Sequence, residues 1–277
     1  MLSNMLERIF KMESLEMIFK TAQLCSEIST KMSLEFKHGS DPQSLKADKS
    51  WVTSADQKIE KELRKIILQN HPTHFIYGEE EGGDIGVDED TYTWILDPID
   101  GTFSFVHNIP FYSSLIAVLK GKTPIIGFAC LPAMGITMSA QKGKGAYING
   151  EKYIKSPLLG SNHIEIVATA DPYRFYLEQK GEILQTLYGQ NKKSRTYPDA
   201  LGYYLLLRGS VRAFIDPKVE IWDVAPFHVI LPEAGFAIQS WDENKELKRG
   251  SSVAYSTDEK NMPINCSDIL ELTKGFA

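Results

Sequence analysis

The chain has 277 residues, of which 43% are hydrophobic and 24% are charged, and this composition excludes an intrinsically disordered protein. The formal net charge is −6 and no basic block stands out, so we expect no nucleic-acid partner. Three scattered cysteines fit neither a disulfide framework nor a zinc site and favour a reducing compartment. No apolar stretch is long enough to cross a bilayer and charged residues interrupt the N-terminal segment, so we expect a soluble, cytoplasmic protein without a membrane partner.

The first part of the sequence predicts two helices followed by a mostly antiparallel sheet. Apolar residues at helical spacing predict a helix over 13–36, and a second helix begins at Thr53 or Ser54 and ends before His71. Strands are expected at 75–77, 92–96, 114–119, 124–131, 136–140 and 145–148. Because Pro98 cannot donate a hydrogen bond to a sheet, we expect the strand over 92–96 to end before it.

After about residue 155 the pattern changes to alternating strands and helices. Strands are expected at 164–169, 195–197, 211–215, 236–239 and 253–256, and helices at 173–188, 201–208, 223–234 and 267–274. This alternation is typical of an α/β arrangement in which helices cover both faces of a sheet. We therefore expect two tightly joined units, residues 1–155 and residues 156–277.

Carboxylates gather where three of these predicted elements begin or end. They are Glu79, Glu80 and Glu81 after the first strand, Asp97 and Asp100 after the second, and Asp223 at the start of a helix. Asp97 and Asp100 can point at one spot on a turn made by Gly101, where a cation would relieve their repulsion. Mg²⁺ prefers such oxygen ligands, and the backbone N–H groups of Gly101 and Thr102 can hold an anion.

Each motif also fits a structural role when it is taken alone. The segment from Asp97 to Thr102 fits a surface turn, Glu79–Glu81 fits a solvated acidic loop, and Asp223 fits a helix cap beside a core tryptophan. The combination of all three in one chain favours a metal site. His71 and His74 also have a spacing that metal sites use, but they lie between a helix and a strand, and we expect them not to bind metal.

Taken together, these segments resemble the inositol monophosphatase family of Mg²⁺-dependent, lithium-sensitive phosphomonoesterases. The matching segments are 51–60, 78–80, 94–102 and 221–225, with a weaker match at 143–150, and the resemblance runs from about Met12 onward. It implies a layered α-β-α-β-α sandwich, of the α+β or α/β class, as in fructose-1,6-bisphosphatase. It also implies a homodimeric hydrolase that acts on a small-molecule phosphate monoester.

The resemblance further implies a role for each site residue. Glu79, Asp97 and the carbonyl of Ile99 would hold a first Mg²⁺, and Asp97, Asp100 and Asp223 a second. Glu80 and Asp56 would orient the water around a third, weaker ion. Thr102, backed by Glu80 or Asp56, would help position the attacking water, and the backbone amides of Gly101 and Thr102 would take phosphate oxygens. No covalent nucleophile is required, because metal ions activate water and neutralise the phosphate oxygens.

The same resemblance leaves the substrate open. Lys46 and the segment around Asp199 are similar to the histidinol-phosphatase branch, in which an acidic residue faces the amine of the substrate. Asp216 stands where the family contacts a substrate hydroxyl or amine. The segment 105–111 is closer to inositol monophosphatases, so histidinol phosphate and inositol 1-phosphate are both candidates. The alternatives are a fructose-1,6-bisphosphatase, a nucleotide bisphosphate phosphatase, or a non-catalytic binding member of the family.

Overall fold

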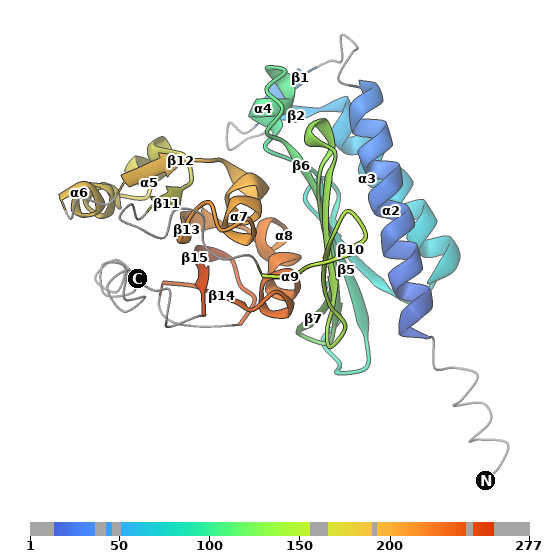
Figure 1. Ribbon diagram of the computed structural model, residues 1–277. Coiled ribbons are helices and arrows are strands. Elements are labelled where there is room, and N and C mark those ends of the chain that lie inside the picture. Colours follow the sequence, from blue (N-terminus) through green and yellow to red (C-terminus); the bar gives the residue numbers. More distant parts are fainter. Residues whose placement is uncertain are drawn as a thin grey trace, which may run out of the picture.

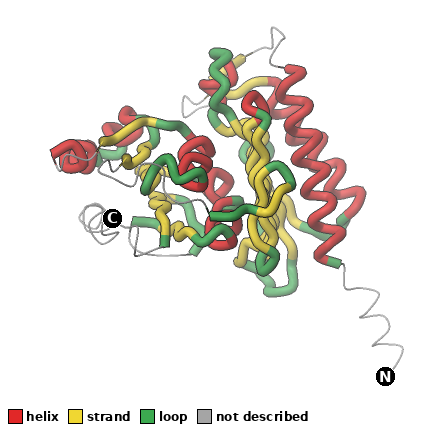
Figure 2. The backbone as a smooth tube through the Cα atoms, in the orientation of Figure 1, coloured by secondary structure: helices red, strands yellow, loops and turns green. Residues whose placement is uncertain are grey.

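The computed structural model describes residues 14–36, 43–45, 51–155, 166–189, 193–241 and 246–257. These residues form two large sheets that alternate with three layers of helices (Figure 1), besides a separate two-stranded sheet. Figure 2 shows the same order, with long helices on one outer side and short helices on the other. The predicted α-β-α-β-α sandwich is confirmed.

The outer helix pair consists of α2 (Leu15–Phe36) and α3 (Ser54–Asn70), which cover one face of the larger sheet. Both helices bury apolar residues three and four positions apart, such as Ile59, Leu63 and Ile67 on α3, against strand residues. The predicted start of α3 is confirmed. Thr53 caps this helix, and its side chain accepts hydrogen bonds from the backbone N–H groups of Ala55 and Asp56.

The larger sheet has eight strands in the order β10-β9-β8-β7-β6-β5-β3-β4. Its strands are β3 (Phe75–Gly78), β4 (Gly82–Gly83), β5 (Tyr92–Asp100), β6 (Ser113–Lys120), β7 (Thr123–Leu131), β8 (Ile136–Gln141), β9 (Gly145–Ile148) and β10 (Glu151–Lys152). Every neighbouring pair is antiparallel except β3 and β5, so the prediction of a mostly antiparallel sheet is confirmed. A separate hairpin joins β1 (Gln43–Leu45) to β2 (Trp51–Thr53), and a short 3₁₀ helix spans Pro132–Met134.

The prediction that the second strand ends before Pro98 is wrong, because β5 continues to Asp100. Between Asp97 and Asp100 its pairing with β6 shifts by one residue, so Pro98 lies in a bulge. A bulge leaves one residue outside the hydrogen-bonded ladder, and a proline is tolerated there. The bulge bends the end of β5 at the point where the two aspartates stand.

The smaller sheet has five strands in the order β12-β11-β13-β15-β14. Its strands are β11 (Ile166–Thr169), β12 (Lys193–Thr196), β13 (Ala213–Val219), β14 (Phe236–Gln239) and β15 (Gly250–Ser256). Strand β11 is parallel to both of its neighbours, β12 and β13, and strand β15 is antiparallel to both of its neighbours, β13 and β14. The helices of this part are α5 (Pro172–Leu177), α6 (Gly181–Gly189), α7 (Asp199–Leu207), α8 (Ile221–Val224) and α9 (Phe227–Glu233). The predicted helix over 267–274 lies outside the described residues.

Two helices predicted as continuous are each divided in two. The helix expected over 173–188 breaks between α5 and α6, where Gln179 adopts a left-handed backbone with φ of 56°. The helix expected over 223–234 breaks at Pro226, which separates α8 from α9. The prediction that Asp223 opens a helix is wrong, because α8 begins at Ile221 and Asp223 is its third residue.

The middle layer consists of α7, α8 and α9, with α7 and α9 packed between the two sheets. Its apolar core joins both sheets, with Phe227 and Tyr203 stacked at 3.9 Å between ring centroids. At Gly127 the chain between α8 and α9 approaches β7 so closely that a Cβ there would lie 2.4 Å from the carbonyl oxygen of Pro226. Among the described residues, no helix is long and apolar enough to span a membrane.

Candidate active site

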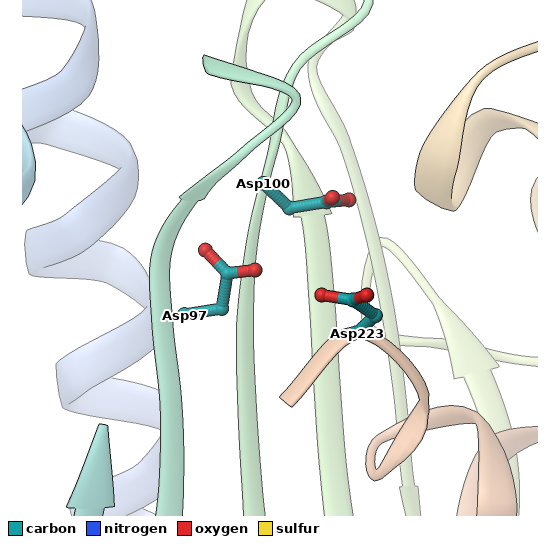
Figure 3. Close-up of side chains that lie close together, drawn as sticks. All are labelled: Asp97, Asp100 and Asp223. Atoms are coloured by element: carbon teal, nitrogen blue, oxygen red, sulfur yellow. The ribbon is translucent and has the colours of Figure 1, made fainter. Parts of the chain in front are cut away.

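Three carboxylates meet at the end of β5 and the start of α8. One oxygen each of Asp97, Asp100 and Asp223 lies within 4.8 Å of the others. Asp97 and Asp100 are 2% and 9% exposed. Figure 3 shows the three side chains directed toward a common space from two different parts of the fold. Such a group of oxygen ligands suits a hard divalent cation.

The surroundings of Asp223 fix its side chain in this direction. Its Oδ2 accepts a hydrogen bond of 2.8 Å from the backbone N–H of Glu220, and the Glu220 side chain accepts one in return from the backbone of Asp223. This reciprocal capping box anchors the first turn of α8. Trp222 is half-buried, and its ring lies 5.6 Å from that of Tyr77, which holds the turn against the larger sheet.

Other carboxylates of the site are anchored in a similar way. Asp56 Oδ2 accepts from the backbone N–H and the hydroxyl of Thr53, at 2.9 and 2.6 Å. Asp100 Oδ2 accepts from the hydroxyl of Ser113 and, at 3.4 Å, from the backbone N–H of Ala200. In contrast, Asp56 Oδ1 and Asp97 Oδ1 are buried without a hydrogen-bond partner among the described residues. Unpaired buried carboxylate oxygens are costly, and a bound cation would satisfy them, so these residues fit a metal ion.

Burial and mutual repulsion raise the pKa values of these acids. Burial raises the pKa of Asp56 to about 7, against hydrogen bonds from Thr53 that lower it. Burial also raises the pKa of Asp100 to about 6. The pKa of Asp97 is raised well above its ordinary value by burial and then by the charges of Glu79 and Asp100. A cluster of acids that holds protons this strongly has a high affinity for positive charge.

Glu79, Glu80 and Glu81, the acidic loop, follow β3 directly beside this cluster. The backbone N–H of Glu79 donates to the carbonyl of Leu96 at 3.0 Å, which ties the loop to β5. The structure places the charge of Glu79 close enough to raise the pKa of Asp97, although its carboxylate is not one of the three that lie within 4.8 Å of one another.

Glu60 is a site residue to which the sequence analysis assigned no role. It is fully buried on α3, and its two oxygens accept hydrogen bonds from the backbone N–H groups of Glu80 and Glu81, at 2.9 and 3.0 Å. The guanidinium of Arg64 balances the charge of Glu60, with its Nη2 2.7 Å from Glu60 Oε1. The spacing of an acid and a base four residues apart was the available signal, but such pairs also occur on exposed helix faces.

The turn after β5 brings Gly101 and Thr102 to the edge of the carboxylate cluster. Gly101 has a φ of 77°, a left-handed conformation that glycine adopts at little cost. Thr102 donates from its hydroxyl to the carbonyl of Ile99 at 3.1 Å. Asp199 lies against this turn, since a Cβ on Gly101 would lie 2.7 Å from Asp199 Oδ2.

Three residues, Lys46, Asp199 and Asp216, are expected to contact the alcohol part of the substrate, and the structure describes two of them. Asp199, at the start of α7, has a left-handed φ of 53°, a strained conformation that is found preferentially at functional sites. Asp216 on β13 is buried and pairs with Arg174 of α5 at 3.2 Å. Lys46 lies outside the described residues.

His71 and His74 pack into the core between α3, α2 and β5. Their rings stack at 4.9 Å between centroids. His71 Nε2 lies 2.9 Å from the hydroxyl of Thr21, and His74 Nδ1 accepts a hydrogen bond from the Trp94 indole at 2.9 Å. These contacts explain the two histidines as buried, hydrogen-bonded core residues.

Comparison with known proteins identifies the class to which this fold and site belong. The model of the inositol monophosphatase family matches residues 13–273. The chain is 32% identical over 233 residues to the bifunctional phosphatase IMPL2, chloroplastic, of Arabidopsis thaliana, which covers 81% of this chain and 64% of that protein. It is 30% identical to a histidinol-phosphatase of Mycobacterium tuberculosis, over 76% of this chain and 81% of that one.

The fold agrees with this assignment. The Thermotoga maritima IMPase superposes with a TM-score of 0.77 at 22% identity, over 91% of this chain and 94% of that chain. Because the family model spans nearly the whole chain, the chain belongs to the inositol monophosphatase family and is a phosphatase of that family.

Proposed function

We propose that the protein is a Mg²⁺-dependent phosphomonoesterase that hydrolyses the phosphate ester of a small polar alcohol. The observation that carries this proposal is the meeting of Asp97, Asp100 and Asp223. In the part of the chain that the structure describes, Oδ1 of Asp97 and Oδ1 of Asp56 are buried without a hydrogen-bond partner. Together with Glu79 and the carbonyl of Ile99, these residues would hold two Mg²⁺ ions. Glu80 and Asp56 would orient the water around a third.

The chain's own residues would then position substrate and water. Bound Mg²⁺ would lower the pKa of water and neutralise phosphate oxygens. The backbone amides of Gly101 and Thr102 would hold phosphate oxygens. The Thr102 hydroxyl lies at the same turn, where together with Glu80 or Asp56 it would orient the attacking water.

Replacement of a shared carboxylate tests this proposal. Asp97→Asn should reduce Mg²⁺-dependent phosphate release by at least about a thousandfold, since it removes several kcal/mol of charge stabilisation. The matched control is Asp90→Asn, at an exposed acid just before β5 that pairs only with Lys120 in the described part of the chain. Near-normal release from folded Asp97→Asn protein, verified by circular dichroism, would contradict the proposal.

The residues beside the metal cluster support two candidate substrates, which differ in their alcohol. Asp199 supports histidinol phosphate, because a carboxylate next to the phosphate turn can receive an amine. The pairing of Asp216 with Arg174 supports inositol 1-phosphate, because it leaves fewer free negative charges. Phosphate release from both esters, with and without Mg²⁺, compares them, and release from neither would lead to tests of fructose 1,6-bisphosphate and nucleotide bisphosphates.

The remaining proposals concern organisation. We expect residues 1–155 to supply most metal ligands and residues 156–277 to supply Asp223 and the substrate contacts. We expect a homodimer in the cytoplasm, and light scattering coupled to size-exclusion chromatography measures the oligomeric state.

A further inference from the structure

Arg174 is the cation that pairs with Asp216, and its own action on the substrate has not yet been considered. It lies on α5, and its Nη1 donates to Asp216 Oδ2 at 3.2 Å and to the Lys218 carbonyl at 3.3 Å. Its side chain is still 39% exposed, and its other N–H groups have no partner among the described residues. Burial lowers the pKa of the Arg174 guanidinium, but the nearby carboxylates of Asp216 and Asp199, the two acids expected on the alcohol side, raise it.

Asp216 is correspondingly occupied. Its side chain is 5% exposed, its Oδ1 accepts from the backbone N–H of Lys218 at 2.9 Å, and its Oδ2 accepts from Arg174. A substrate ammonium group at this position would have to compete with a guanidinium for the same buried carboxylate. It would also meet the repulsion of that guanidinium at short range.

A hydroxyl group meets no such conflict. An arginine–carboxylate pair offers both free donors and free acceptor lone pairs, and a hydroxyl can donate to one and accept from the other. An ammonium group has only donors and a positive charge. The pair is therefore complementary to the hydroxyl groups of a polyol.

We propose that Arg174 is a specificity-determining residue, which selects the phosphate ester of a neutral polyol over that of an amino alcohol. This inference rests on the proposed phosphomonoesterase function. Arg174 would donate a hydrogen bond to a hydroxyl of the alcohol, and its partner Asp216 would accept one from it. Without Arg174, the buried Asp216 carboxylate is left to attract a cation.

The test compares inositol 1-phosphate with histidinol phosphate on the wild-type protein, Arg174→Gln and Arg174→Lys. In Arg174→Gln, KM for inositol 1-phosphate should rise about tenfold, the effect of one lost hydrogen bond to a charged group, while KM for histidinol phosphate stays equal or falls. The kcat values should change little. Arg174→Lys keeps the charge and should keep the wild-type order of substrates. The control is Arg208→Gln, which removes an exposed arginine directly after the C-terminal end of α7.

A ratio of kcat/KM for the two esters that stays within about twofold of wild type in Arg174→Gln would overturn the proposal. Equal losses for both esters would also overturn it, since they indicate a general structural role. Calorimetric titration of each ester into the Mg²⁺-loaded proteins gives the same comparison without turnover. Absence of Mg²⁺-dependent hydrolysis in the wild type contradicts the proposed function, whereas the order of binding in the variants tests Arg174 separately.

Discussion

Glu60 anchors the acidic loop, although it is not one of the three carboxylates of the cluster. Its carboxylate accepts two backbone N–H groups of the loop, and glutamine at this position offers only one oxygen. We expect Glu60→Gln to raise the Mg²⁺ concentration for half-maximal activity about tenfold, the effect typical of lost support around a metal site. Glu62→Gln, at a partly exposed glutamate of the same helix that pairs with Lys65, should leave this concentration unchanged. Equal Mg²⁺ dependence in both variants would show that the loop does not need Glu60.

Gly101 is constrained both by its backbone and by its neighbours. In Gly101→Ala the new Cβ would sit in a left-handed conformation and 2.7 Å from Asp199 Oδ2. Gly143 has the same φ of 77° but open space around it, so Gly143→Ala carries only the backbone cost of about 1–2 kcal/mol. We expect Gly101→Ala to lose most activity and Gly143→Ala to keep it, as measured by phosphate release at saturating Mg²⁺. Full activity in Gly101→Ala would mean that Asp199 moves freely.

The sequence identified residues whose chemistry shows in a short motif. Asp97, Asp100 and Asp223 stand at the ends of recognisable elements, and the structure brings them together. Glu60 and Arg174 were missed as functional candidates, because a charged residue within a helix is usually solvated and its partners lie far away in the chain. Only the fold brings Arg174 to Asp216.

At the scale of whole elements, strands and helices were predictable by type but less so at their ends. The apolar run of β5 indicated a buried strand, yet a bulge carried it past Pro98. Periodicity also could not detect the breaks between α5 and α6 or between α8 and α9, because apolar residues keep helical spacing across both. The second break matters for the site, since it sets the short helix that carries Asp223.

The contact between β7 and the segment joining α8 to α9 sets where α8 lies. Gly127→Ala would place a Cβ 2.4 Å from the Pro226 carbonyl oxygen, with no left-handed strain involved. We expect this overpacking to cost about 1–3 kcal/mol of unfolding free energy and to weaken Mg²⁺ binding by displacing α8. Gly181→Ala, at the start of α6, has nothing within 4 Å of the new Cβ and should lower neither the unfolding free energy nor Mg²⁺ binding. Urea unfolding and Mg²⁺ titration measure the two effects, and unaltered Mg²⁺ binding in Gly127→Ala would contradict the expected coupling.

At the scale of the molecule, the raised pKa values make stability depend on pH when no metal is bound. Asp56 and Asp100, with pKa values of about 7 and 6, bind more protons in the folded than in the unfolded state. Their contribution to stability is therefore present at low pH and is lost as the pH rises through these values. We expect the Tm of the protein in a chelator to fall between about pH 4 and pH 7, and to fall less with Mg²⁺ present.

Differential scanning fluorimetry across this range measures the effect. In the Asp56→Asn variant the decline should be shallower, because one of the titrating groups is gone. A Tm in chelator that is constant or rises over this range, with no difference between wild type and Asp56→Asn, would contradict the assignment.

The three carboxylates of the cluster come from β5 and α8, which are far apart in the chain and belong to different layers of the fold. An ion bound by all three would close a long loop of the polypeptide, as a covalent crosslink does, but reversibly. The free energy of this crosslink would grow with the logarithm of the free ion concentration. The fraction of unfolded chains, and with it the rate of cleavage by proteases, would then fall as the free Mg²⁺ concentration rises.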